Sequence, residues 1–291
     1  MKLPGFDYAC PTSLGEAVAL LASHGGDAKP LAGGQSLIPM LALRVASPAL
    51  LVDLRKLVEL RRIEIAGDGV RLGAMVRWHD ILNDPRLRAA HPLLVAAVAH
   101  IGHFQIRNRG TVGGSLAHAD PAAELPCIAV TCEASIAVIG GGGARHIAAG
   151  AFFHGPLTTA LNPDELVTEI HFPPWPARRR FGFAEFSRRR GDFALAAAAL
   201  FYDEAGDTSE ARENCAANAH VGVIGGADRP LRLEPVESIL NGKPIGEAIV
   251  AAAERAAAAT VDPAGDIHAG AAYRKALIGV MVERALRQAA A

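Results

Sequence analysis

The stretch Thr111–Pro126, "TVGGSLAHADPAAELP", contains adjacent glycines, hydroxyl side chains and several ionisable groups. A second glycine turn lies upstream in Pro30–Met40, "PLAGGQSLIPM". There an apolar run predicts a short buried strand that leads into Gly33 and Gly34, and a helix is predicted to begin near Ser36. Glycines bring backbone N–H groups close to a ligand, and a helix start adds unpaired donors. Each turn is therefore either a plain chain reversal or part of a site for a phosphate-bearing ligand.

The standard nucleotide signatures are absent from the sequence. No GxGxxG follows a predicted strand and no GxxxxGK[ST] occurs, so neither a Rossmann fingerprint nor a P-loop is available. Polar side chains beside both glycine pairs favour the phosphate interpretation without naming the ligand. No GxSxG and no recognisable Cys–His arrangement occurs, so the sequence predicts no nucleophilic catalytic residue.

Composition excludes several classes of protein. The chain has 291 residues, 51% of them hydrophobic and 20% charged, with a formal net charge of −1. This predicts a globular protein of one large or two to three smaller domains, without the basic surface of a nucleic-acid binder. The cysteines form no CxxC pair, so no metal site of this chain alone is expected; they are Cys10, Cys127, Cys132 and Cys215. Scattered thiols, no signal peptide and no long apolar run together predict a soluble, cytoplasmic protein.

Local patterns predict alternating helices and strands before residue 172. Ser13 and Glu16 form a capping box at the start of a helix, "SLGEAVALLASHG". Two segments alternate around glycine turns and predict hairpins, "RIEIAGDGVRLGAM" and "ASIAVIGGGGARHIAA". Further predictions are a strand buried on both faces in "ALLVDL", a helix from His91 to about Gly102, and a strand in "DELVTEIHF".

The clearest break is Pro173–Arg180, "PPWPARRR". Its prolines stop regular structure, and the basic run after them is predicted to be solvated. We therefore place the main boundary between Phe172 and Arg179. Beyond it, "RFGFAEFSRR" and "FALAAAALFYDE" predict strands, and the alanine-rich end from Glu237 predicts helices.

Three segments carry a family resemblance: "LAGGQSLIPMLALR", "IRNRGTVGGSLAHADPAAELP" and "RRRGDFALAA". Together they resemble the FAD-binding medium subunit of the molybdenum hydroxylases, of the xanthine dehydrogenase and carbon monoxide dehydrogenase types. The resemblance extends over nearly the whole chain. It implies an α+β protein, with a two-lobed FAD-binding fold of the vanillyl-alcohol-oxidase type plus a smaller C-terminal α+β domain. The expected FAD-binding domain is residues 1–175, with lobes at about 1–60 and 61–175, and the C-terminal domain is residues 178–291.

The resemblance also implies a role in electron transfer. Electrons would pass from a molybdenum cofactor in a large subunit, through [2Fe-2S] clusters in a small subunit, to FAD in this chain and then to an external acceptor. The partners would form a dimer of heterotrimers with this chain. Substrate chemistry would belong to the molybdenum subunit, so the resemblance implies no catalytic residue and no metal ligand here.

The resemblance assigns cofactor contacts to particular positions. The diphosphate would be held by the first turn, Ala32, Gly33, Gly34, Gln35, Ser36 and Leu37, and closed on by Thr111, Gly113, Gly114 and Ser115. Glu124 occupies a position where relatives usually have an aspartate that bonds the ribityl or ribose hydroxyls. The backbone of Val167 would reach the flavin ring and Ile101 would line the cofactor, with His118 and Asp120 also in the cofactor loop. Some relatives place a lysine beside the flavin where this chain has Ala184 and Glu185, so a basic group would come from Arg188, Arg189 or elsewhere.

Several polar residues have two readings. Asp120 is either a general base or the N-cap of a helix starting at Pro121, and the cap is preferred. Arg107 and Arg109 either screen a diphosphate or are exposed loop cations. Four histidines could hold a metal but are expected to be ordinary surface or hydrogen-bonding residues; they are His91, His100, His103 and His118.

The sequence is also compatible with two other functions. One is a free-standing FAD-dependent oxidoreductase that acts on its own small-molecule substrate. The other is a scaffold subunit with a decayed flavin site, against which the intact glycines argue.

Overall fold

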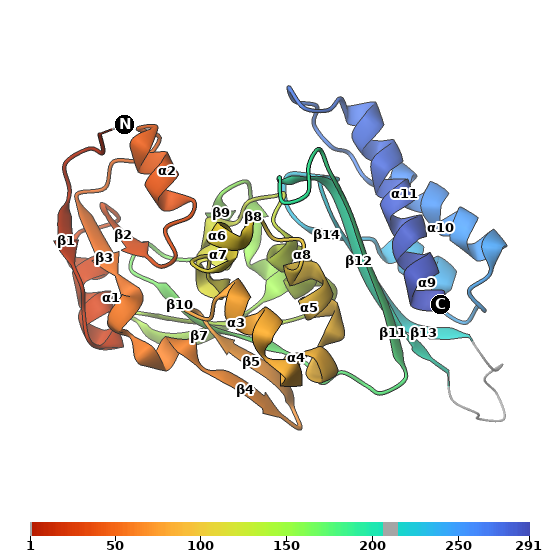
Figure 1. Cartoon of the computed structure of the whole chain (residues 1–291), viewed down its shortest axis with the longest axis horizontal. Helices are drawn as coiled ribbons and strands as arrows, with labels where there is room; N and C mark the ends of the chain where they lie inside the picture. The colour runs from red at the N-terminus through yellow and green to blue at the C-terminus, as the bar shows by residue number, and fades with distance from the viewer. Residues whose placement is uncertain (1, 206–214) are drawn as a thin grey trace.

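A computed structural model describes residues 2–205 and 215–291. It shows three units in a row, with the N-terminal lobe and the C-terminal helices at opposite ends (Figure 1). The fold is the expected mixture of helices and sheets. Among the described residues, no helix is both long enough and apolar enough to cross a membrane.

The first lobe is a small parallel sheet in the order β1-β3-β2, flanked by helices. Its central strand is buried at every position, as the apolar run predicted. Ser13 caps the first helix by accepting from the Glu16 amide at 3.2 Å, and the Glu16 carboxylate accepts from the Thr12 amide at 2.8 Å. The elements are β1 (Asp7–Ala9), α1 (Leu14–Ser23), β2 (Ala28–Leu31), α2 (Leu37–Ala42) and β3 (Leu50–Asp53).

The second lobe is an antiparallel sheet in the order β4-β5-β10-β6-β7. Both predicted hairpins are present, as β4–β5 and β6–β7. The strands are β4 (Ile63–Ala66), β5 (Gly69–Gly73), β6 (Ser135–Gly140), β7 (Gly143–Ala148) and β10 (Leu166–Phe172), with a short pair β8 (Phe153–Gly155) and β9 (Thr158–Thr159). The helices are α3 (Trp78–Asn83), α4 (Pro85–Ala90), α5 (Pro92–Val98), α6 (Phe104–Arg107), α7 (Val112–His118) and α8 (Glu124–Thr131).

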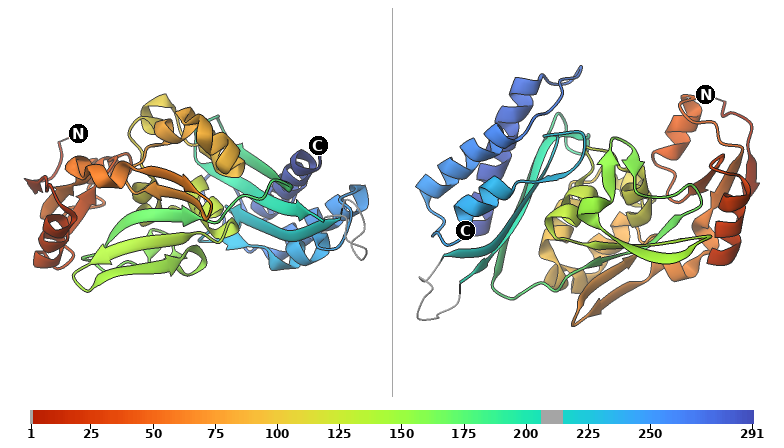
Figure 2. Two further views of the ribbon diagram at one scale, coloured as in Figure 1. Left: turned by 90° about the horizontal axis from the view of Figure 1, so that it is seen from below. Right: turned by 180° about the vertical axis from the view of Figure 1, so that it is seen from behind.

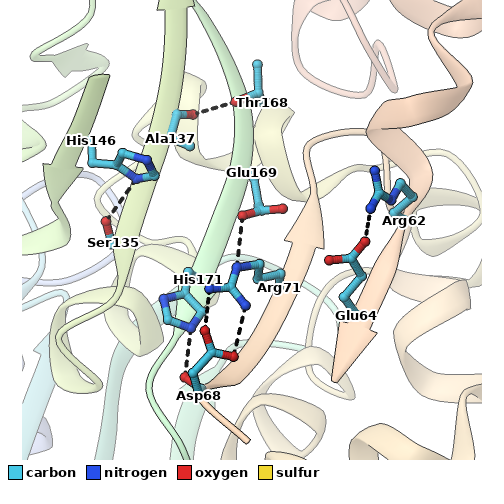
Figure 3. A network of polar contacts seen from close by, with 10 residues as sticks. All are labelled: Arg62, Glu64, Asp68, Arg71, Ser135, Ala137, His146, Thr168, Glu169 and His171. Carbon is cyan, nitrogen blue, oxygen red and sulfur yellow. Dashed lines mark hydrogen bonds and ion pairs between the residues drawn. The ribbon is translucent and has the colours of Figure 1, made fainter. Parts of the chain in front are cut away.

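The two faces of this sheet differ. In β6, buried and half-buried residues alternate, so one face packs on the core and the other is accessible. Figure 3 shows polar side chains on these strands, where Arg71 of β5 lies 2.6 Å from Asp68 and 3.6 Å from Glu169 of β10. Such accessible pairs add little stability, and they leave the opposite face to the helices.

Helix α5 ends earlier than the predicted end at Gly102. Its last residue is Val98, and tight turns follow, in which the Ile101 amide donates to the Val98 carbonyl at 3.2 Å. Gly102 then adopts a φ of +51°, in the region that favours glycine. The chain therefore leaves the helix before Ile101, which lies in a loop.

The C-terminal unit is a sheet in the order β11-β12-β13-β14, covered on its outer face by helices (Figure 1). Strand β12 is buried on both faces. Ala197, Ala199 and Phe201 join the core of the second lobe, whereas Ala198 and Leu200 join the core under the helices. This explains the continuous apolar run. The elements are β11 (Arg179–Ser187), β12 (Ala194–Glu204), β13 (Ala216–Ile224), β14 (Leu231–Arg232), α9 (Glu234–Leu240), α10 (Glu247–Thr260) and α11 (Ala271–Ala290).

The basic run after the prolines is not solvated throughout, so that prediction is wrong for Arg179. Its side chain is 10% exposed and its Nε lies 2.7 Å from Asp203 Oδ1. The guanidinium lies 4.0 Å from the ring centroid of Phe201 and also over Trp175. The cause is the strand register, because β11 begins at Arg179 and pairs that residue with Asp203 of β12. Figure 2 shows the two units meeting at this sheet.

His91 is buried in the second lobe as a neutral ring. Its Nδ1 accepts a hydrogen bond from the Leu94 amide at 3.2 Å, and the ring packs against Phe172 and Trp175. Burial, with a smaller effect of the Arg179 charge, lowers the pKa of His91 to about 3. The pKa of His91 is therefore lower in the folded chain than in the unfolded chain. Above the unfolded-state pKa the ring is neutral in both states. As the pH falls from there towards the folded-state pKa, the unfolded chain binds the proton first and the folded chain loses stability.

We therefore expect the chain to lose stability below about pH 6.5, by about 1.4 kcal/mol per pH unit from this residue. His91→Gln removes the titrating ring and should flatten the dependence of the unfolding free energy on pH between about 5 and 7. The control is His146→Gln, on the exposed strand β7, which should keep the wild-type profile. Urea unfolding at several pH values measures both. An unchanged slope in His91→Gln would show that His91 is not the titrating group.

Candidate cofactor site

The first glycine turn connects β2 to α2 and presents a row of free donors. Among the described residues, none accepts a hydrogen bond from the backbone N–H groups of Gly33, Gly34, Gln35 and Ser36. Gly34 has a φ of +71°, and the Gln35 side-chain amide folds back to donate to the Gly33 carbonyl at 3.0 Å. Ser36 makes no side-chain capping bond to α2. Consecutive free N–H groups in such a turn form a concavity that binds anions.

The second turn is built differently, because its amides already have partners. Thr111 caps α7 by accepting from the Gly114 amide at 3.2 Å, and the Gly113 amide donates to the Ala74 carbonyl at 2.8 Å. A Cβ added at Gly113 would lie 2.5 Å from that of Ala74. Gly113 therefore allows α7 to approach the segment after β5, and Ser115 is half-buried in the first turn of the helix.

The two turns are in contact with each other. A Cβ at Gly33 would lie 2.1 Å from the Arg109 carbonyl oxygen and 2.9 Å from Gly110 Cα, so no side chain fits there. A Cβ at Gly114 would lie 3.6 Å from that of Ala32. The first turn of the N-terminal lobe therefore lies against the segment that leads into α7.

The arginines before the second turn have different positions. Arg107 donates from Nη1 to the carbonyls of Ile101 and Gly102, at 3.1 and 2.6 Å, and so fixes the loop after α5. Arg109 is exposed. Arg107 therefore stabilises a loop, a role that neither interpretation included, and Arg109 has the exposure of a loop cation. Ile101, held by this loop, is only 8% exposed.

Asp120 does not cap a helix that begins at Pro121, so that prediction is wrong. Its Oδ1 accepts from the Ala122 amide at 2.8 Å, and its carbonyl accepts from the Ala123 amide at 3.0 Å. These bonds close a turn, and α8 begins only at Glu124. His118 is half-buried at the end of α7, and the following C-cap residue Ala119 has a φ of +50°.

Glu124 is buried at the first position of α8, with 8% of the residue exposed. Burial, then repulsion from Glu185 and Asp120, raises its pKa to about 8.

Val167 lies in the central strand β10, at a bulge in its pairing with β6, and α7 packs on that strand. The residues predicted to contact the cofactor thus come from both lobes, and Val167 lies on a strand, as the sequence predicted.

Glu185 is a buried carboxylate that the sequence did not single out as a ligand. It lies on β11 with its side chain 3% exposed, and its Oε1 is 3.8 Å from His100 Nδ1. Its Oε2 is buried and has no hydrogen-bond partner among the described residues. The sequence offers two signals: one carboxylate in an apolar strand, "FGFAEFS", and the family resemblance, which puts Ala184 and Glu185 where some relatives have a lysine beside the flavin.

The histidines do not converge on one point. His91 belongs to the core and His100 lies beside Glu185. His103 lies next to Gly191, because a Cβ added at Gly191 would be 2.6 Å from the Nδ1 atom of His103. Within residues 2–205 and 215–291, no group of three or more His, Cys, Asp or Glu side chains is placed to hold a metal ion.

Comparison with known proteins places this architecture in a family. Residues 4–175 match the family described as FAD binding domain in molybdopterin dehydrogenase. Residues 181–289 match the CO dehydrogenase flavoprotein C-terminal domain. The two matches together extend over most of the chain.

Individual relatives match at full length. The nicotine 6-hydroxylase medium subunit of Paenarthrobacter nicotinovorans is 38% identical over 291 residues, covering 100% of this chain and 99% of the relative. The carbon monoxide dehydrogenase medium chain of Hydrogenophaga pseudoflava is 38% identical over 286 residues, covering 98% and 97%.

Solved structures agree. A carbon monoxide dehydrogenase from Hydrogenophaga pseudoflava superposes with a TM-score of 0.94 at 38% identity, covering 99% of this chain and 98% of the other. Quinoline 2-oxidoreductase from Pseudomonas putida 86 gives 0.93 at 35% identity, covering 100% and 98%. The resemblance of the glycine motifs and the expected fold are confirmed. This chain belongs to the FAD-binding medium subunits of the molybdenum hydroxylases, and it is a flavoprotein subunit of an oxidoreductase.

Proposed function

We propose that the first glycine turn holds the diphosphate of FAD. The observation that carries this assignment is the row of free N–H groups from Gly33 to Ser36, which offers four neighbouring donors to an anion. The turn includes no lysine or arginine, so recognition rests on backbone donors and on the absence of a side chain at Gly33. Ala32 and Leu37 complete the segment on either side.

The second turn closes the site by close approach. Gly113 and Gly114 allow α7 to pack tightly, Thr111 fixes the start of the helix, and Ser115 presents a hydroxyl from its first turn. Ile101, His118, Asp120, Glu124 and Val167 complete the cofactor contacts. The FAD-binding domain is residues 1–175 and the C-terminal domain residues 178–291.

Within the complex, this chain carries electrons rather than substrate. FAD accepts and releases electrons singly or in pairs, which suits it to link one-electron clusters to an external acceptor. The large subunit contributes the molybdenum cofactor and the small subunit the [2Fe-2S] clusters. We place the assembly, a dimer of heterotrimers, in the cytoplasm. The residues of this chain bind and orient the cofactor and limit the access of water to it.

An absorbance spectrum of the chain purified with its genomic neighbours tests this function, followed by acid release of the cofactor. We expect flavin bands at about 370 and 450 nm, released FAD, and iron–sulfur absorbance in the co-purifying chains. A chain that purifies alone and whose flavin is bleached by a substrate would instead be a free-standing oxidoreductase. A colourless chain that takes up no added FAD would overturn both and leave the scaffold role.

A further inference from the structure

Two buried carboxyl groups from different units meet beside the proposed cofactor site. Glu124 begins α8 in the second lobe, and Glu185 lies on β11 in the C-terminal unit, yet the two side chains are within hydrogen-bonding reach. Other buried carboxylates of the described chain each have an arginine partner: Asp53 with Arg55, Glu165 with Arg145 and Glu237 with Arg232. In the described part of the chain, no arginine or lysine forms an ion pair with Glu124 or Glu185.

The surroundings do not neutralise two negative charges. Asp120 adds a further negative charge from the preceding turn, and the Cys127 thiol, one turn along α8, is buried and has a raised pKa. Within residues 2–205 and 215–291, the one basic side chain that pairs with the couple is His100, which is 42% exposed and lies beyond hydrogen-bond distance at 3.8 Å from Glu185. Two adjacent buried carboxyl groups cannot both ionise without a large penalty, so they retain one proton between them.

The couple lies next to the residues assigned to FAD. Glu124 follows the loop of His118 and Asp120, and His100, beside Glu185, immediately precedes Ile101. The Glu185 Oε2 atom is buried without a partner, and an unsatisfied buried polar atom in a native fold marks a missing ligand or water. Here it gives the C-terminal unit a polar contact at the cofactor site.

We propose that Glu124 and Glu185 share one proton and that this singly protonated couple, through the free Glu185 Oε2, forms a hydrogen bond with a hydroxyl or N–H group of FAD. The proposal rests on the proposed FAD site. Loss of the shared proton to solvent leaves two carboxylates and Asp120 beside an anionic cofactor. FAD affinity therefore depends on the protonation of the couple and falls once the second carboxyl ionises.

The test is a titration of the full-length, FAD-free chain with FAD, followed by quenching of flavin fluorescence, from about pH 6.5 to 9.5. We expect the wild-type Kd to be constant at low pH and to rise towards tenfold per pH unit above about pH 8. Glu185→Gln removes the repulsion that adds to burial in raising the pKa of Glu124, so the rise in Kd should begin at a lower pH than in the wild-type chain. Glu124→Gln removes that group altogether, so the rise should disappear. Glu204→Gln is the control, because Glu204 lies on the neighbouring strand in an accessible pair with Arg180 and should keep the wild-type profile.

A second measurement needs no variant. Infrared difference spectra of the wild-type chain between about pH 6.5 and 9.5 should show a protonated-carboxyl band that disappears at high pH, because ordinary carboxyl groups are already ionised at the lower value. Absence of the band, or a wild-type Kd that does not change with pH, would overturn the shared proton while leaving the FAD site intact. Failure of the wild-type chain to bind FAD at any pH would instead overturn the proposed function.

Discussion

Replacing Gly33 by alanine is expected to lower FAD affinity at least about tenfold, which corresponds to about 1.4 kcal/mol of binding free energy. The added methyl would lie 2.1 Å from the Arg109 carbonyl oxygen, and backbone atoms at that point cannot rotate away as a side chain does. The first turn must therefore move off the segment before α7. That movement displaces the four free N–H groups that we propose bind the diphosphate.

Flavin content per chain after purification, and Kd by titration, measure the effect. Gly67→Ala is the matched control, since a Cβ there meets nothing within 4 Å, and it should retain wild-type affinity. Far-ultraviolet circular dichroism shows whether each variant is folded. Full flavin occupancy in folded Gly33→Ala would remove the first turn from the site. A substitution at Gly114 is a less direct probe, because its Cβ would lie 2.8 Å from the Thr111 hydroxyl that caps α7.

The second large effect is expected at the junction of the units. Arg179→Ala should reduce the free energy of unfolding by about 3 kcal/mol, because it leaves Asp203 without its ionic partner in a partly buried position. It also removes the guanidinium from the faces of Phe201 and Trp175. Arg180→Ala, on the next residue of β11, breaks only the more exposed pair with Glu204 and should reduce it by less than about 1 kcal/mol.

Chemical unfolding of both variants at neutral pH gives the comparison directly. Arg179→Lys is a useful third protein, because it keeps the charge but not the planar fork that bonds Asp203 through two nitrogens. It should be destabilised to an intermediate extent. Equal stabilities of Arg179→Ala and Arg180→Ala would show that the Arg179 contacts contribute no more than a surface pair.

Much of the fold could be predicted from local patterns. The hairpin around Gly67 and Gly69 is determined by alternating residues and a glycine turn within one short segment. The burial of Arg179 could not be predicted, because it depends on which residue of β12 lies opposite it, and pairing register over long range is not visible in a local pattern. The Asp120 prediction failed for a different reason. Asp followed by Pro is typical of both helix starts and turns, and here the turn is formed.

In the candidate site too, local sequence predicts some residues and only the fold identifies others. The first glycine turn could be recognised from the sequence because its free donors belong to consecutive residues. The Glu124–Glu185 couple could not, since it requires a helix start and a strand of another unit to meet. A lone glutamate in an apolar strand indicates only that a buried carboxyl group needs a polar partner. That the partner of Glu185 is Glu124 follows from the fold alone.

Strand β12 contributes to the cores on both of its faces, which limits how modular this subunit can be. The prolines before β11 mark a convenient place to divide the gene, but the packing continues across it through Ala197, Ala199 and Phe201. A fragment that stops there would expose the apolar side of α8 and its neighbours to water, with the aggregation that such a surface invites. Exchange of C-terminal units between relatives therefore requires the inward-facing residues of β12 to be transferred together with the surface they contact.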